Sequence, residues 1–447
     1  MHEYAWYLKM IRKNKYKADA SEFSDDEDLD VFQSENDTQR RLNAYKIKRI
    51  KHNHPDTKHV SFGREYFSEK GWARLGDYMA SNNHVECMSL RQCNLNDANM
   101  SVFFKGAQKS SLVVLTLYNV GFGSDGIRCL VPFLQNACNL TSLNVSGNLI
   151  KTEGLWWLMK GLTGGSIEKL NLRHCGLTNL AVIEKCSLTN LQVLYLSDNS
   201  NIDGCESIAE LLRRGGSKLK KLYLNRCNIR DEGAEMIANS LTNNTSLTHL
   251  ELESNNITLK GQLALLRLVN DISSVNKTYN SNHTLRLIGM NGNAVMLYNK
   301  YIQDGIQINR HHGGDIIQAG RAKVIKYQLN SNMKSILSGL QGVSDKVPFL
   351  DIDSIVLPEL VSLVGRESGL SDMYRLILAR SSDLGFSVYG TDNKALKEKV
   401  VSLNAIIAEQ SKQIAALTAQ NLDLRTKIAS MDGRQSRGKK RPISEVL

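Results

Sequence analysis

Three glycines near residue 120 come closest to a chemical motif. Gly121, Gly123 and Gly126 form a G-x-G-x-x-G pattern between an apolar run and a predicted helix. In dinucleotide-binding folds such glycines let the backbone approach a pyrophosphate at a helix N-terminus. No acidic residue stands where a ribose would need it, and the last glycine recurs at matching places as Gly154, Gly233 and Gly261. We therefore interpret Gly126 as a packing residue of a repeat, and we expect no cofactor.

Metal and nucleophile chemistry is no better supported by the sequence. His52, His54 and His59 lack the partner Cys or His pairs of a zinc site. No combination of nucleophile and base stands out, so we expect no catalytic residue, no metal and no enzymatic activity. The 8 cysteines contain no C-x-x-C pair, which indicates free thiols in a reducing, intracellular compartment, the cytoplasm, the nucleus or both.

The elements that position these residues belong to a repeat. Seven segments follow the template apolar-x-x-apolar-x-apolar-x-x-(Asn/Cys)-x-apolar, starting at residues 85, 112, 140, 167, 191, 219 and 247. Their third apolar residues are Leu90, Leu117, Val145, Leu172, Leu196, Leu224 and Leu252, spaced by 27, 28, 27, 24, 28 and 28 residues. A degenerate eighth copy stands at 284–293. A period of this length is typical of a solenoid, in which each unit packs only on its neighbours.

Each repeat predicts one short strand and one helix. Alternating apolar residues such as Leu115 and Leu117 predict a strand with one buried face, and residues 125–137 and 231–243 are apolar at helical spacing. The Asn or Cys of the template stands where the chain turns and can bond backbone groups there. The period, with Cys93, Cys175 and Cys227 in the Asn position, resembles the ribonuclease-inhibitor type of leucine-rich repeat. That resemblance implies an α/β horseshoe solenoid with a concave parallel sheet, a fold that serves as a general binding surface.

Side chains between the buried positions of each strand face the concave side, because side chains alternate along a strand. The pairs run from Ser89/Arg91, Thr116/Tyr118, Asn144/Ser146 and Asn171/Arg173 to Tyr195/Ser197, Tyr223/Asn225 and Glu251/Glu253. Tyrosine and arginine commonly anchor protein interfaces. We therefore predict that a protein partner binds Arg91, Tyr118, Arg173, Tyr195, Tyr223, Asn225, Glu251 and Glu253. The alternative is that these positions are polar only because they are exposed.

The flanking segments differ from the repeats in charge and pattern. Residues 1–60 combine an acidic run at 21–30 with a basic stretch at 40–54, which predicts a segment without packed structure. We expect an N-terminal cap at 61–83, repeats at 84–293 and a helical C-terminal cap at 294–385, which includes an amphipathic stretch at 322–340. The segments at 62–79 and 319–330, together with the repeats, also resemble uncharacterised repeat proteins of unicellular algae.

A heptad pattern follows a linker at 386–393 and covers residues 394–432. Its seam includes Leu396, Val400, Leu403, Ile407, Ile414, Leu417, Asn421, Leu424 and Ile428, with Gln410 and Met431 at the other two d positions. β-Branched residues at a, mostly Leu at d and one Asn at a favour a parallel dimer, with Asn421 fixing the register. The alternative is an amphipathic helix that packs on its own domain.

The last segment, 433–447, is a basic tail. Lys439, Lys440 and Arg441 resemble a nuclear import signal, and a solvated tail is the alternative reading. A basic-zipper transcription factor would need a basic region before the heptads. The only basic residues at 380–395 are Arg380 and Lys394. We do not expect nucleic acid as a partner. No apolar run approaches the ~18 residues of a membrane helix, so no membrane partner is expected either.

Together these features predict a non-enzymatic interaction scaffold that binds a protein and dimerises through its heptads. The alternative is a GTPase-activating regulator, because the Ran GTPase-activating proteins share this repeat type. Their acidic C-terminal segment is absent here, where residues 391–447 carry 11 basic and 6 acidic side chains.

Overall fold

The computed structural model describes residues 37–329, except 187, 201, 203–204 and 291–295. The chain divides into two compact units, Met1–Asp345 and Lys346–Leu447, and the described residues all lie in the first. The predicted linker, heptad region and basic tail lie outside the described residues, as does the cap region beyond residue 329.

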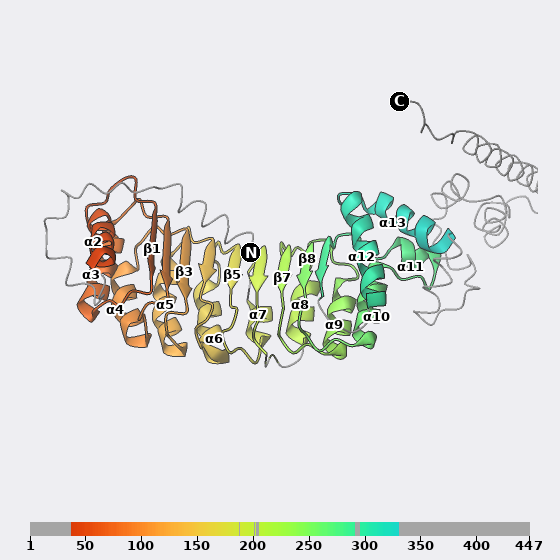
Figure 1. Cartoon of the computed structure of the whole chain (residues 1–447), viewed down its shortest axis with the longest axis horizontal. Helices are drawn as coiled ribbons and strands as arrows, with labels where there is room; N and C mark the ends of the chain where they lie inside the picture. The colour runs from red at the N-terminus through yellow and green to blue at the C-terminus, as the bar shows by residue number, and fades with distance from the viewer. Residues whose placement is uncertain (1–36, 187, 201, 203–204, 291–295, 330–447) are drawn as a thin grey trace, which may run out of the picture. The chain divides into compact units, whose positions relative to one another are not determined.

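A parallel sheet of nine strands forms one layer of the described unit (Figure 1). Its strands are β1 (His59–Gly63), β2 (Cys87–Arg91), β3 (Val114–Tyr118), β4 (Ser142–Asn144), β5 (Lys169–Asn171), β6 (Val193–Tyr195), β7 (Lys221–Tyr223), β8 (His249–Glu251) and β9 (Leu287–Gly289). Each strand pairs with the next in sequence, so spatial order equals chain order. The predicted repeats are therefore confirmed, and β9 confirms the degenerate copy at 284–293.

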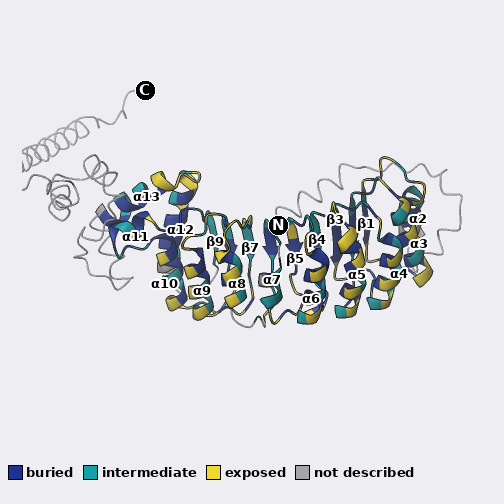
Figure 2. Cartoon of the chain, turned by 180° about the vertical axis from the view of Figure 1, so that it is seen from behind, coloured by how far each residue is buried: buried dark blue, intermediate teal, exposed yellow. Residues whose placement is uncertain are grey.

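Helices form the second layer and connect successive strands. They are α2 (Asp37–Lys51), α3 (Glu69–Ser81), α4 (Asp97–Ala107), α5 (Ser124–Asn136), α6 (Lys151–Leu162), α7 (Ala181–Lys185), α8 (Glu206–Arg213), α9 (Asp231–Leu241), α10 (Leu259–Val269), α11 (Val275–Tyr279), α12 (Met296–His311), α13 (Ile316–Val324) and the π-helix η3 (Ile325–Leu329). Figure 2 shows the buried residues along the strands and the exposed residues on the outer sides of the helices. The helices predicted at 125–137 and 231–243 correspond to α5 and α9.

The core lies between the sheet and the helices, and the strand register builds it. Leu90 pairs with Leu117, and Leu170 pairs with Leu194, so equivalent leucines of successive repeats stack along the solenoid. These leucines are fully buried. Each repeat therefore completes its core with the next one, which is why a single repeat could not fold alone.

Part of the N-terminal segment is helical, so the prediction of an unpacked segment over 1–60 is wrong for residues 37–51. Helix α2 buries Ala44, Ile47 and Ile50, which share one side of the helix at a spacing of three residues. This stripe lies among basic residues, whose charge masked it in the sequence. The Lys46 ammonium donates hydrogen bonds to the Ser61 carbonyl on strand β1 at 2.9 Å and to Asn43 Oδ1 at 3.1 Å. Helix α2 thus contacts the edge strand of the sheet.

The repeat array begins one strand earlier than predicted. Strand β1 starts before the expected cap at 61–83, and Phe62 pairs with Leu90 in the same register as the later repeats. Val60 and Phe62 are buried, so His59–Gly63 has the alternation of a repeat strand. Helix α3 connects β1 to β2 and packs on α4, so it is the helix of this first repeat and not a cap. The Ser68 hydroxyl caps its N-terminus by accepting from the Gly71 amide at 3.1 Å.

Helices α12 and α13 follow the last strand. Helix α12 contacts α10, and α13 contacts α11. The helix predicted over 322–340 is confirmed only in part, because α13 ends at Val324 and continues as η3 to Leu329. Lys323 is fully buried and donates to the Asn282 carbonyl at 2.9 Å. Beside it, burial and then the charge of Lys323 lower the pKa of His283 to about 4.

Candidate partner-binding surface

Asparagines at the template position hold three of the repeats against the ones before them. Asn148 is 1% exposed, and its amide nitrogen donates to the carbonyls of Leu117 and Val145 at 2.7 and 2.8 Å. Its oxygen accepts from the Val120 and Gly121 amides at 2.9 and 3.0 Å. Asn199 makes the same kinds of bonds two repeats later, and Asn255 makes them four repeats later. The predicted role of this template position is confirmed.

Cysteines in the same position make weaker bonds. The thiols of Cys93, Cys175 and Cys227 lie 3.3–3.7 Å from carbonyls of their own and the preceding repeat. Burial raises the pKa of Cys175 and Cys227 to about 12, so both stay protonated. All 8 cysteines of the chain are free, as the sequence predicted, and these buried thiols are structural.

For every strand from β1 to β8, the residue that follows the last outward-facing residue has a left-handed backbone conformation. The backbone φ angle is +48 to +77° at Arg64, Gln92, Asn119, Gly147, His174, Asp198, Arg226 and Ser254. The amides of these residues from Arg64 to Arg226 donate to carbonyls of the following repeat, for example His174 to Ser197 at 3.0 Å and Asp198 to Asn225 at 2.8 Å. This position was missed in the sequence, although the Gly, Asn and Asp among its residues tolerate left-handed backbone and are a signal for it.

The predicted partner-binding residues lie on one face of the sheet, opposite the helices. The register pairs Arg91 with Tyr118, and it pairs Tyr223 with both Tyr195 and Glu251. Tyr118 is 42% exposed. The rings of Tyr195 and Tyr223 stack with centroids 4.4 Å apart and planes inclined by 12°. Three aromatic side chains from different repeats therefore share this outward face.

Four small residues on the same face are less exposed than predicted. Ser89, Thr116, Ser146 and Ser197 are buried, because larger neighbours cover them. The Arg91 guanidinium donates to the Ser89 hydroxyl at 3.0 Å, and the Ser146 hydroxyl donates to Asn144 Oδ1 at 2.6 Å. The face available to a partner therefore consists of the longer side chains.

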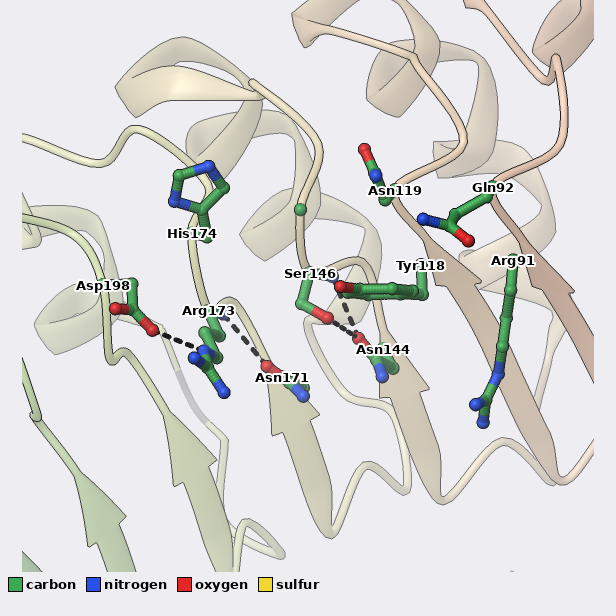
Figure 3. A pocket seen from close by; sticks show the side chains of 11 residues that line it. Arg91, Gln92, Tyr118, Asn119, Asn144, Ser146, Asn171, Arg173, His174 and Asp198 are labelled. Carbon is green, nitrogen blue, oxygen red and sulfur yellow. Dashed lines mark hydrogen bonds and ion pairs between the residues drawn. The ribbon is translucent and has the colours of Figure 1, made fainter. Parts of the chain in front are cut away.

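A hollow of about 790 Å³ opens on this face over strands β2–β5 and the turn that follows β6. Figure 3 shows side chains from the strands and from the left-handed positions around it. It is lined by Arg91, Gln92, Tyr118, Asn119, Asn144, Ser146, Gly147, Asn171, Arg173, His174 and Asp198. Of the predicted partner-binding residues, the hollow brings together Arg91, Tyr118 and Arg173, while Tyr195, Tyr223, Asn225, Glu251 and Glu253 lie outside its lining.

Charged side chains are unevenly placed on the outward face. Arg173 and Arg226 both form ion pairs with Asp198, the latter at 3.4 Å. Farther along, Asn225 Oδ1 accepts from the Glu253 amide at 2.7 Å. Burial raises the pKa of Glu251 above its usual value, although a hydrogen bond from Asn225 lowers it, and nearby Glu253 adds to the rise. The acidic end of the face is thus built around Asn225.

Comparison with known proteins agrees with this architecture. The profile of the family described as "Leucine Rich repeat" matches residues 136–155, 217–238 and 243–266. The chain carries leucine-rich repeats of the ribonuclease-inhibitor type. Ribonuclease inhibitor from Mus musculus is 29% identical over 201 residues, which cover 43% of this chain and 44% of the inhibitor. The inhibitor from Sus scrofa is 30% identical over 198 residues, 42% of this chain and 43% of that protein.

Other similar proteins are larger, and one solved structure matches at low identity. "NACHT, LRR and PYD domains-containing protein 5" of Mus musculus is 29% identical over 194 residues, 41% of this chain and 17% of that protein. The yeast Rad7 and Elc1 complex contains a chain that is 16% identical, with a TM-score of 0.32, covering 52% of this chain and 63% of that one. The chain spans less than half the length of each of these curated relatives. Leucine-rich repeat regions of this kind generally mediate protein–protein interaction and are typically non-enzymatic.

The G-x-G-x-x-G pattern belongs to the leucine-rich repeat. Asp97 Oδ1 from the preceding repeat accepts from the Gly123 and Gly126 amides at 2.7 and 2.8 Å. A carboxylate of the protein thus holds the amides that a phosphate would need. Asp231 accepts equivalently from the Gly261 amide at 3.0 Å. A Cβ atom on Gly126 would lie 2.6 Å from Asp97 Oδ1, which explains the glycine as a close approach between repeats.

Among the residues with described structure, no group of three or more His, Cys, Asp or Glu side chains is arranged to hold a metal ion. None of the helices in this part of the chain is both long and apolar enough to span a bilayer.

Proposed function

We propose that this protein is a non-enzymatic interaction protein that binds a protein partner through the outward face of its sheet. The observation that carries the proposal is the tyrosine set on that face: exposed Tyr118 and the stacked pair Tyr195 and Tyr223. Tyrosine offers a large contact area at a low cost in side-chain entropy and is enriched among residues that dominate binding energy.

The repeat backbone supports this role by fixing the face before a partner arrives. The asparagine bonds and the left-handed turns hold each strand end against its neighbours. Side chains on such a rigid surface lose little further conformational freedom on binding. A preorganised face with an aromatic centre and charged ends is suited to one specific protein partner.

The experiment compares the wild-type chain with a variant that carries Tyr118→Ala, Tyr195→Ala and Tyr223→Ala. Partners captured from lysate by the full-length wild type are identified and purified, and their affinity is measured for both proteins. The triple variant should bind at least tenfold more weakly while its circular-dichroism melting curve stays nearly unchanged. Trp156→Ala is the matched control, because Trp156 is 48% exposed on helix α6, in the helical layer behind the sheet. Equal affinity of the triple variant and wild type would refute the proposed face.

The second part of the proposal is a parallel homodimer through residues 394–432. It rests on the heptad seam from Leu396 to Ile428 with Asn421 at an a position. Sedimentation equilibrium of the full chain should give twice its mass of 50.0 kDa, and a chain that ends at residue 385 should be a monomer. Asn421→Ile should stabilise the association but relax its restriction to two strands. A full chain that remains monomeric at tens of micromolar would rule out self-association through this segment.

The rival function, activation of a small GTPase, has a direct assay. Single-turnover GTP hydrolysis by Ran and other small GTPases is measured with and without the full-length protein. A non-enzymatic protein leaves the rate unchanged. A concentration-dependent acceleration would replace the present proposal with the GTPase-activating one.

We also propose that Lys439, Lys440 and Arg441 direct the protein to the nucleus, on the basis of the basic sequence alone. A fluorescent fusion of the full chain should accumulate in nuclei, and a variant with all three residues changed to Ala should not. The same distribution for both fusions would remove the import role.

A further inference from the structure

The outward face of the sheet is electrically polarised along the row of repeats. The positions considered are the outward residues of each strand and the left-handed residue that follows. From β1 to β5 the charged side chains at these positions are Arg64, Arg91, Lys169 and Arg173, all of them basic. From β6 to β9 they are Asp198, Lys221, Arg226, Glu251 and Glu253, three acidic and two basic. The formal charge thus changes from +4 to −1 across the face.

Three of these charges stand in one row at equal intervals. Arg91 is in register with Tyr118, and Arg173 and Glu253 are the equivalent residues of later repeats, two positions beyond Asn171 and Glu251. Strands β2, β5 and β8 are each three strands apart. Neighbouring strands lie about 4.8 Å apart, so each interval is about 14 Å.

An extended peptide has a matching period. Its residues advance by about 3.4 Å, so four residues span about 14 Å, and residues at even spacing point to the same side. A segment that crosses the strands along this row therefore presents every fourth side chain to Arg91, Arg173 and Glu253 in turn. Between the first two contacts it passes Tyr118 and Ser146, which line the same hollow.

We propose that the partner binds by an extended segment that crosses the strands and carries two acidic residues four apart, followed after four more by a basic residue. The carboxylates pair with Arg91 and Arg173, and the cation pairs with Glu253. Arginine and carboxylate form strong, charge-assisted hydrogen bonds. Asn144, Asn171 and Asn119 supply amide groups along the floor and rim of the hollow for the backbone of such a segment. This inference rests on the proposed function and specifies the ligand of the same face.

Asp198 tunes this site, because it holds Arg173 and Arg226 through ion pairs. An incoming carboxylate competes with Asp198 for Arg173. Asp198→Asn removes that competition and keeps a residue that tolerates the φ of +61° at this position. The variant should therefore bind the acidic segment several-fold more tightly, an effect that damage to the fold would not produce.

The probe is a fluorescent nine-residue peptide with Glu at its first and fifth positions, Lys at its ninth, and Ser or Tyr elsewhere. Its affinity for the full-length protein is measured by anisotropy at several salt concentrations. Arg91→Gln and Arg173→Gln should each weaken binding at least tenfold, and rising salt should weaken binding to the wild type, since salt screens exposed charges. Lys221→Gln is the matched control on the same face outside the hollow and should leave the affinity nearly unchanged.

Four results would overturn the inference. The first is unchanged peptide affinity after either arginine substitution, and the second is unchanged affinity for a peptide whose second Glu is moved by one position. The third is a single-stranded oligonucleotide that binds more tightly than the peptide and depends on Arg91 and Arg173. The fourth is a tenfold gain in peptide affinity on deletion of residues 1–36. The last result would assign the site to the acidic run at 21–30 of this same chain. If the tyrosine variant loses its partner while the arginine variants retain it, the proposed function stands and this inference fails.

Discussion

Asn148, Asn199 and Asn255, here called the asparagine ladder, bond the backbone of neighbouring repeats. Replacing Asn148 by Cys tests whether this ladder stabilises the repeats. Cys occupies the equivalent position at Cys93, Cys175 and Cys227, so the substitution uses a residue that the chain itself accepts there. Asn148 makes four close bonds to backbone groups, two as donor and two as acceptor. A thiol replaces at most one of these well. Three lost bonds at about 1 kcal/mol each, at a buried position, predict a loss of about 3–4 kcal/mol.

The assay is urea denaturation of the full chain followed by circular dichroism, with Asn136→Ala as the control. Asn136 is exposed and bonds only the Pro132 carbonyl of its own helix, at 2.9 Å, so its loss should change stability by about 0.5 kcal/mol or less. A shift below about 1 kcal/mol for Asn148→Cys would show that Asn and Cys are equivalent here. The ladder would then be a by-product of the fold and not one of its causes.

Two further predictions concern packing and pH. Gly126→Ala places a methyl group 2.6 Å from Asp97 Oδ1 and should cost about 1–3 kcal/mol in the same assay, whereas Gly215→Ala, which meets open space, should be neutral. If Gly126→Ala is equally neutral, the close approach between repeats is not rigid. Burial lowers the pKa of His283 from its usual 6.5 to about 4. Below pH 6.5 the unfolded chain therefore binds a proton at this histidine, whereas the folded chain does not until the pH approaches 4. Stability should fall by up to roughly 3 kcal/mol as pH drops from 6.5 to 4. His283→Gln should reduce that slope and exposed His52→Gln should not; equal slopes would refute the assignment.

The repeat fold was predictable because its signal is repeated. The pattern around Leu90, Leu117 and Leu172 is read many times in one chain, so local ambiguity averages out. The terminal elements occur once and lack that support. Helix α2 and strand β1 were missed for this reason: Ile47 and Phe62 are buried, but each lies in a segment whose charge or length did not fit the template.

The candidate site was predictable only as a face. Strand alternation placed Tyr118, Tyr195 and Tyr223 on one side, and the register confirms that placement. The sequence could not reveal that Tyr195 stacks on Tyr223, or that Asp198 pairs with two arginines, because both depend on side-chain geometry across repeats. The left-handed positions were missed because the template treats them as unspecified residues between the strand and the Asn or Cys.

In each repeat, the residues that hold the backbone in place differ from the residues whose side chains make up the outward face. Asn148, Asn199 and Asp97 bond backbone groups of neighbouring repeats, whereas Tyr118 and Arg173 project from the finished face. Substitutions in the first set should therefore change stability, and any change in binding should follow from unfolding. Substitutions in the second set should change binding while the fold is kept. A tyrosine variant that loses its partner and melts at the wild-type temperature is the observation that distinguishes a binding face from a polar surface.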